Sequence, residues 1–334
     1  MRVIVAIVVG VALVIGAVVF WRSPAPVDTA WGSYKQRFVG PDGRVMDTGN
    51  GNVSHTEGQG YAMLLAVAHD DRATFDRVWG WTRDTLRRPD GLYSWRYTPG
   101  AEKPVADLNN ATDGDLVMCW ALLRAAAAWN RPADRDAALT LAAAMKPLIV
   151  RDGTEAYLLP GIDGFVGDGK RVVNLSYWVY PALKAIAATT NDAAWNDVAA
   201  TGARLVEKAR FGDHKLPPDW LETAGTLRPA DGFPPRFGYD AIRIPLYLIW
   251  GGYGDAAHLD AISAFWRERG SAGAPAWIDL TTGDVSPEKQ SPGMAAVKQL
   301  TLGEAKSPSV TTDDYYSTSL RMLTALAEKE RAAR

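Results

Sequence analysis

Residues 54–68 read SHTEGQGYAMLLAVA, in which a polar loop leads through one acid into an apolar helix. The i, i+3, i+4, i+7 spacing that marks one face of a helix is kept by Tyr61, Leu64, Leu65 and Ala68. Helical spacing returns at 116–123, 242–249 and 316–327, and charged, Ala-rich helical stretches lie at 133–148, 192–209 and 255–270. Strand-like alternation is scarce and confined to short pieces such as 92–97. The sequence therefore predicts an all-α fold.

The predicted helices number about eleven or twelve and are separated by loops rich in Gly and Pro. Apolar helices rich in Ala, Leu and Trp alternate with more charged ones, which indicates an inner and an outer layer. About twelve helices in a single domain over 31–330 fit an (α/α)6 barrel, in which six helical hairpins form two concentric rings. The layering alone supports the barrel as an interpretation.

Composition narrows the class of protein. Of the 334 residues, 47% are hydrophobic and 22% charged, which is typical of a globular chain. The 36 basic and 38 acidic residues are interspersed, so we expect no nucleic-acid partner and no basic membrane-binding surface. Cys119 is the one cysteine, which excludes an internal disulfide and a thiolate metal cluster, and its apolar surroundings predict a buried side chain.

The N-terminal segment predicts export. Arg2 precedes an uncharged apolar stretch from Val3 to Phe20, and a Pro-rich segment follows. We interpret 1–21 as a signal peptide or an N-terminal membrane anchor, and 22–30 as a linker. The stretch lacks a clean A-x-A cleavage site, and a helix of its length just spans a bilayer, so both alternatives stay open.

Three acids stand at three predicted helix starts: Glu57, Asp113 and Asp240. If alternate helices run parallel inside a barrel, their N-termini gather on one rim and the acids converge there. Ordinary capping is the alternative, because carboxylates are common at helix starts. Ser54 with Glu57, or Thr56 with Gln59, has the spacing of a capping box. Periodicity does not decide between these interpretations.

The order and spacing of several short sequence blocks favour a shared site over ordinary capping. They are Trp31 to Gly43-Arg44-Val45, Thr56-Glu-Gly-Gln-Gly-Tyr-Ala-Met63, Ala111-Thr-Asp-Gly-Asp115, Asn174-Leu-Ser-Tyr177, Pro218-Asp-Trp220, Tyr239-Asp-Ala-Ile-Arg243 and Asp314-Tyr-Tyr316. Together they resemble glycoside hydrolase family eight, and most closely the endoglucanases encoded alongside bacterial cellulose synthase. The resemblance covers nearly all of the predicted exported part.

The resemblance implies an (α/α)6 barrel that hydrolyses β-1,4-glucosidic bonds in cellulose or a related glucan with inversion. It implies that Glu57 is the general acid, Asp240 the general base, and Asp113 the carboxylate that orients the sugar being cleaved. It implies no metal and no cofactor. The partners it implies are a β-glucan polysaccharide or oligosaccharide and a cellulose synthase complex, and the location is the periplasm or outside the cell, tethered to the inner membrane if the anchor is retained.

Four further residues are predicted to bind substrate. Arg243 and Tyr177 match residues that line the family's reaction centre, and Trp95 matches an aromatic sugar platform. Tyr239 is chosen because its loop flanks an acid. Thirteen Trp residues suit sugar stacking, although core packing explains most tryptophans in globular proteins.

The implied chemistry sets demands on the site. Inversion needs a protonated carboxyl on the leaving oxygen and an ionised one that activates water, at a separation of roughly 6.5–9.5 Å. A helix N-terminus and the nearby Arg243 should lower the pKa of Asp240. Glu57 needs burial or the charge of Asp113 to keep its proton. Pro245 predicts that its helix begins late or bends, with Asp240 on an irregular turn.

Other functions remain open on the sequence alone. The same fold and acids would serve an enzyme for chitosan, xylan or a mixed-linkage β-glucan. A non-catalytic polysaccharide-binding protein of a secretion complex is an alternative of another class, although binding needs aromatic platforms and not retained acids. His55 neighbours Glu57, but no second ligand cluster accompanies it for a metal.

Overall fold

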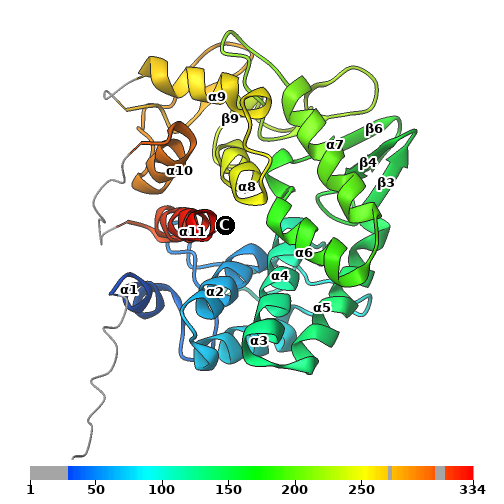
Figure 1. The fold of residues 1–334 in the computed structure, drawn as a ribbon, viewed down its shortest axis with the longest axis vertical. Coiled ribbons are helices and arrows are strands. Elements are labelled where there is room, and N and C mark those ends of the chain that lie inside the picture. The colour runs from blue at the N-terminus through cyan, green and yellow to red at the C-terminus, as the bar shows by residue number, and fades with distance from the viewer. Residues whose placement is uncertain (1–28, 270–272, 305–312, 334) are drawn as a thin grey trace, which may run out of the picture.

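The computed structural model describes residues 29–269, 273–304 and 313–333, and this part of the chain contains eleven α-helices (Figure 1). They are α1 Thr29–Phe38, α2 Thr56–Ala68, α3 Arg72–Leu86, α4 Thr112–Trp129, α5 Pro132–Met145, α6 Tyr180–Thr190, α7 Ala194–Lys208, α8 Ile244–Gly251, α9 Ala256–Arg269, α10 Pro292–Leu302 and α11 Tyr315–Ala332. The stretches predicted from the sequence coincide with seven of them, namely α2, α4, α5, α7, α8, α9 and α11, and no individual range was predicted for α1, α3, α6 or α10. The prediction of an all-α fold is confirmed.

Six helices form a closed inner ring. In the order α2, α4, α6, α8, α10, α11 each contacts the next, and α11 returns to α2 (Figure 1). Two inner helices are enclosed almost completely: every residue of α8 and nearly every residue of α2 is buried. The outer helices α1, α3, α5, α7 and α9 bury one face only, as α3 does with Phe75, Val78 and Trp79. This is the predicted (α/α)6 barrel.

The two rims of the ring differ in the length of their connections. An inner helix passes to its outer partner through a few residues, which contain left-handed Asn130, Asn191 or Gly252. Outer helices return to the next inner helix through long segments such as 87–111, 146–179 and 209–243. The N-termini of the inner helices therefore share one rim with the long loops, and this rim carries the site.

Ten short β-strands, all in the loops, accompany the helices of the described residues. They are β1 Ser54–His55, β2 Arg96–Tyr97, β3 Ile149–Asp152, β4 Glu155–Leu158, β5 Val166–Gly167, β6 Lys170–Val173, β7 Leu221–Glu222, β8 Arg228–Pro229, β9 Arg236–Phe237 and β10 Ile278–Asp279. The antiparallel pairs are β1 with β2, β3 with β4 and β9 with β10, and β5-β6-β7-β8 form a four-stranded sheet. Sequence analysis anticipated strand only near 92–97, because strands of two to four residues are too short to display a period of two.

Two local predictions are confirmed. Helix α8 begins late, at Ile244, with Pro245 in its first turn, and a 3₁₀ turn over Ala241–Arg243 precedes it. Cys119 is fully buried.

The apolar stretch Val3–Phe20, the predicted segment 1–21 and most of the predicted linker 22–30 lie outside the described residues. The first described helix begins at Thr29, two residues before the predicted start of the domain. In the part of the chain that is described, no helix has both the length and the apolarity to cross a bilayer.

Candidate active site

Glu57 lies in the first turn of α2, and its side chain turns away from its own helix end. Its Oε1 accepts a hydrogen bond of 2.7 Å from the Tyr61 hydroxyl and pairs with Nη1 of Arg243. The helix is capped instead by His55, whose Nδ1 accepts from the backbone N–H of Gly58 at 3.0 Å. The capping-box interpretation of Ser54 and Glu57 is therefore wrong, because Ser54 lies in β1 and the Glu57 carboxylate has other partners.

Asp113 occupies the first turn of α4 and is 3% exposed. Its Oδ1 accepts from the backbone N–H of Gly114 at 2.8 Å. The two helices that carry Glu57 and Asp113 cross here at very short range, since a Cβ built on Gly114 would stand 2.6 Å from the backbone nitrogen of Glu57. Glycine after the acid is thus required for the two acids to stand side by side.

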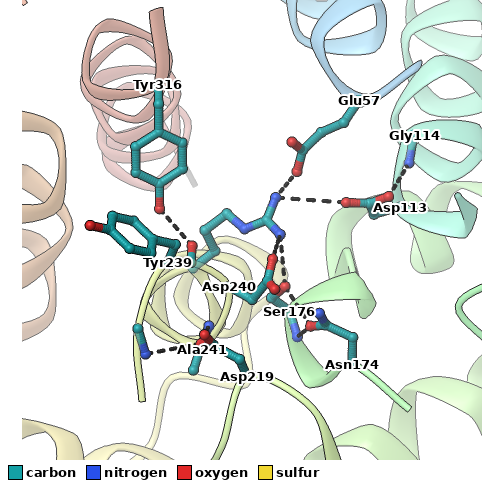
Figure 2. A network of polar contacts seen from close by, with 12 residues as sticks. Glu57, Asp113, Gly114, Asn174, Ser176, Asp219, Tyr239, Asp240, Ala241 and Tyr316 are labelled. Atoms are coloured by element: carbon teal, nitrogen blue, oxygen red, sulfur yellow. Dashed lines mark hydrogen bonds and ion pairs between the residues drawn. The ribbon is translucent and has the colours of Figure 1, made fainter. Parts of the chain in front are cut away.

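Asp240 begins the 3₁₀ turn before α8, and Arg243 ends it. Arg243 is 4% exposed, and both terminal nitrogens of its guanidinium contact carboxylates. Nη1 contacts Glu57 and stands 3.6 Å from Oδ2 of Asp113, while Nη2 is 2.7 Å from Oδ1 of Asp240. Nη2 also donates to Oγ of Ser176 at 3.0 Å. Figure 2 shows the three predicted acids converging from three separate segments of the chain.

These carboxyls outnumber the cation that they share. One guanidinium neutralises one carboxylate, so a fully ionised trio would leave two net negative charges in surroundings that largely exclude water. Burial raises the pKa of Asp113 to about 7, although the Gly114 N–H and the charge of His55 oppose it. Asp113 is therefore protonated in part near neutral pH.

The pKa of Asp240 is also raised well above its ordinary value. Burial is the largest cause, followed by the negative charges of Asp219 and Asp113, and a hydrogen bond from Asn174 and the charge of Arg236 oppose them. The expectation that a helix start would lower this pKa is wrong, because burial in the folded chain outweighs the local field. The side chain keeps 29% of its surface exposed, so water can still reach it.

The predicted aromatic residues lie around these acids. The carbonyl of Trp95 accepts from the backbone N–H of Thr56 at 3.0 Å, next to Glu57, and its indole N–H donates to Asp107 at 2.7 Å. Tyr177 stands near two of the acids, since the charges of Asp113 and Asp240 add to burial in raising the pKa of its phenol.

Tyr239 is 40% exposed, and its carbonyl accepts from the Tyr316 hydroxyl at 2.6 Å (Figure 2). The structure thus brings all seven predicted site residues to one rim.

Other tryptophans serve packing. Those among the largest fully buried side chains are Trp178, Trp195, Trp250 and Trp266. Trp31 is buried as well, and half-buried Trp220 stacks with the rings of Phe165 and Phe233.

Sequence reasoning missed several polar partners. Tyr61 was counted as one member of an apolar stripe, yet its hydroxyl also lies 2.7 Å from that of Tyr247. Asp219 belonged to a resembling block but received no role, and its carboxylate accepts from the backbone on both sides of Asp240. Asn174 accepts from the Ser176 hydroxyl at 2.7 Å. No local pattern marks the partners of Tyr61 and Asp219, because Tyr247, Gly238 and Ala241 are distant from them in the sequence.

Among the described residues, no group of three or more His, Cys, Asp or Glu side chains is arranged to hold a metal ion. His55 lies 3.5 Å from Asp47 and 3.9 Å from Glu57. The site combines three carboxyl groups beside one guanidinium with tyrosine hydroxyls around them. Such a set can donate a proton on one side and accept one on the other.

Comparisons with known proteins place the chain in a family. The sequence profile of glycosyl hydrolases family 8 matches residues 1–330. An endoglucanase from Cellulomonas uda is 44% identical over 88% of this chain and 83% of its own length. A probable endoglucanase from Novacetimonas hansenii is 40% identical over 96% of this chain and 97% of its own. The solved structure of an endo-β-1,4-glucanase from Acetobacter xylinum superposes with a TM-score of 0.86 at 40% identity, covering 92% of this chain and all of that one.

Proposed function

This chain belongs to glycosyl hydrolase family 8, and on that premise we propose that it is an endo-acting β-1,4-glucanase that cleaves cellulose or a related glucan with inversion. One observation carries the proposal: Glu57 and Asp240, 183 positions apart, contact the two ends of a single guanidinium. Their contacting oxygens lie no more than about 8 Å apart, given ordinary hydrogen-bond lengths. That separation is compatible with the single water that inversion requires.

The roles follow from the surroundings of each carboxyl. Glu57 protonates the glycosidic oxygen while the Tyr61 hydroxyl holds its carboxyl in place. Asp240 takes the proton of the attacking water, and a pKa raised by burial makes it a stronger base than an exposed carboxylate. Asp113 binds the sugar being cleaved. Arg243 fixes the positions of the three carboxyl groups relative to one another and stabilises the negative charge among them.

Replacement of each acid by its amide tests these roles. We expect Glu57→Gln and Asp240→Asn each to lower kcat by about 10²–10⁴-fold. Calorimetry with a cello-oligosaccharide should still detect binding to both variants. Asp231→Asn is the matched control, because Asp231 is exposed and pairs with Arg228 at the surface. Unchanged turnover in Glu57→Gln would refute the assignment of the acid, and a wild-type protein that binds without turnover would be a polysaccharide-binding protein.

The stereochemistry is tested separately. Proton NMR of the first products should show the α anomer, which then equilibrates in solution. Early appearance of the β anomer would mean retention and would exclude Asp240 as a base acting through water.

Substrate choice is tested on one preparation. We expect release of reducing sugar from carboxymethyl-cellulose above that from lichenan, xylan or chitosan. If carboxymethyl-cellulose releases no sugar and one of the other polymers does, that polymer is the substrate of the same mechanism.

We also propose that the enzyme is exported and acts beside a cellulose synthase complex. The apolar segment 3–20 and the resemblance to endoglucanases encoded with cellulose synthase support this. Cell fractionation of the full chain, compared with a chain that lacks residues 1–21, should find only the full chain outside the cytoplasm. Recovery of both in the cytoplasm would refute export. Loss of the gene should alter the amount of cellulose deposited, and an unaltered amount would refute the link to synthesis.

A further inference from the structure

Asp219 is buried beside the segment that carries Asp240, and its hydrogen-bond acceptors are directed at that segment. It is 3% exposed. Its Oδ1 accepts from the backbone N–H groups of Gly238 and Ala241, both at 2.9 Å, and its Oδ2 accepts from Nε of Arg236 at 3.0 Å. Figure 2 shows Asp219 beneath Asp240 and Ala241, on the side away from Glu57.

These bonds supply a cap that Asp240 does not supply itself. Asp240 stands at the N-cap of the 3₁₀ turn, where an aspartate usually accepts from a backbone N–H of the first turn. Its side chain makes no such bond, because it is turned toward Arg243. Asp219, which precedes Ala241 by 22 positions, accepts from the N–H of Ala241 in place of Asp240. The Asp240 carboxylate is thereby free to face the site.

The packing around this cap is close. A Cβ built on Gly238 would stand 3.1 Å from Oδ2 of Asp219 and 3.0 Å from the Cβ of Trp277. The backbone next to Asp240 thus approaches Asp219 more closely than a larger residue would allow. Asp219 binds the backbone of the turn, and Arg243 binds the side chain of Asp240.

We propose that Asp219 is a positioning residue that holds the turn of Asp240 and adds a fixed negative charge behind it. The inference rests on the proposed role of Asp240 as the general base. It assigns to the Pro218-Asp-Trp220 block a function in the reaction and not only in the fold.

The charge of Asp219 affects the pKa of Asp240 in one direction. Burial raises the pKa of Asp219, while the backbone N–H groups of Ala241 and Gly238 and the charge of Arg236 oppose that rise and favour the ionised form. An anion at this place raises the pKa of Asp240, so removing it should lower that pKa. The other charged or titratable groups that face Asp240 are Asp113, Tyr177, Arg236, Arg243 and Tyr316. Of these groups, Arg236 pairs with Oδ2 of Asp219, so a substitution at 219 also changes the partner of Arg236.

Two variants separate the cap from the charge. Asp219→Asn keeps an oxygen for both backbone donors but removes the charge, so we expect kcat to stay within a few-fold of wild type. Since the base must be ionised, the acid limb of the pH profile of kcat/KM should move to lower pH. Asp219→Ala removes both features. We expect the same movement of the acid limb and about a 100-fold loss of kcat with little change in KM, because misplacement by about 1 Å has that order of effect.

Asp71 provides the matched control. It caps α3 through the N–H of Thr74 and pairs with Lys35, remote from the acids. Asp71→Ala should lower the unfolding temperature and leave kcat and the acid limb unchanged. If Asp219→Ala behaves in the same way, or if neither Asp219 variant moves the acid limb, the inference is wrong. Asp240→Asn distinguishes the two proposals, since full activity in that variant would refute the role of Asp240 itself, whatever the Asp219 variants do.

Discussion

Gly114→Ala adds one methyl group at the crossing of α2 and α4. The new Cβ would stand 2.6 Å from the backbone nitrogen of Glu57 and 2.7 Å from the Cβ of the buried Thr56, where 3.4 Å is an ordinary contact. Neither neighbour is the tip of a flexible side chain, so the helices must separate by roughly 1 Å in a close-packed interior. Overpacking of this kind costs about 1–3 kcal/mol, and the better helix propensity of alanine offsets about 0.5–1 kcal/mol of it.

The effect on activity should be larger than the effect on stability. A shift of about 1 Å between Glu57 and Asp113 should lower kcat by about 100-fold. Kinetics on a soluble cello-oligosaccharide and a thermal unfolding curve measure the two effects on one preparation.

Gly80→Ala is the control, because a Cβ on Gly80 in the outer helix α3 meets nothing within 4 Å. That variant should be fully active and slightly more stable. Wild-type kcat in Gly114→Ala would refute the argument that glycine sets the distance between the acids.

Three further predictions concern groups around the site. Tyr61→Phe removes the hydroxyl that donates to Glu57 and should lower kcat by about 10–100-fold with little change in KM, since hydrogen bonds to charged groups contribute about 1.5–3 kcal/mol; an unchanged kcat would contradict it. Burial raises the pKa of Asp115 to about 8, so the folded state keeps a proton that the unfolded chain releases near pH 4, and stability falls as pH rises between these values. Asp115→Asn should therefore gain unfolding temperature relative to wild type between pH 5 and pH 8, and parallel curves would refute this. Asp107→Ala frees the indole of Trp95 and should raise KM several-fold with kcat kept, whereas a lower kcat at constant KM would show that Trp95 does not act in binding.

The helices were predicted from local patterns, and the roles of the three acids from the resemblance to glycoside hydrolase family eight. The stripe from Tyr61 to Ala68 and the capping neighbourhood of each acid are readable within one or two helical turns. The position of Pro245 alone predicted the late start of α8. Convergence of the acids on one rim was conditional on parallel inner helices, and ordinary capping remained the alternative on local patterns alone.

What the sequence could not predict depends on the tertiary fold. The sign of the pKa shift of Asp240 was predicted wrongly, because a local field was weighed without the burial that only the folded chain provides. The cap from Asp219 and the bond between Tyr61 and Tyr247 join distant positions, and no periodicity reports such pairs. The short loop strands are fixed by pairing and not by composition.

The unequal rims of the barrel bear on how the enzyme can be attached to a surface. Helix α11 starts beside Tyr239 and has 18 residues, so its far end lies about 27 Å from its start, on the rim of short turns. A tether joined beyond α11 would leave a long polymer free access to Glu57 and Asp240. An insertion into any of the long return loops would instead stand in the path of the polymer.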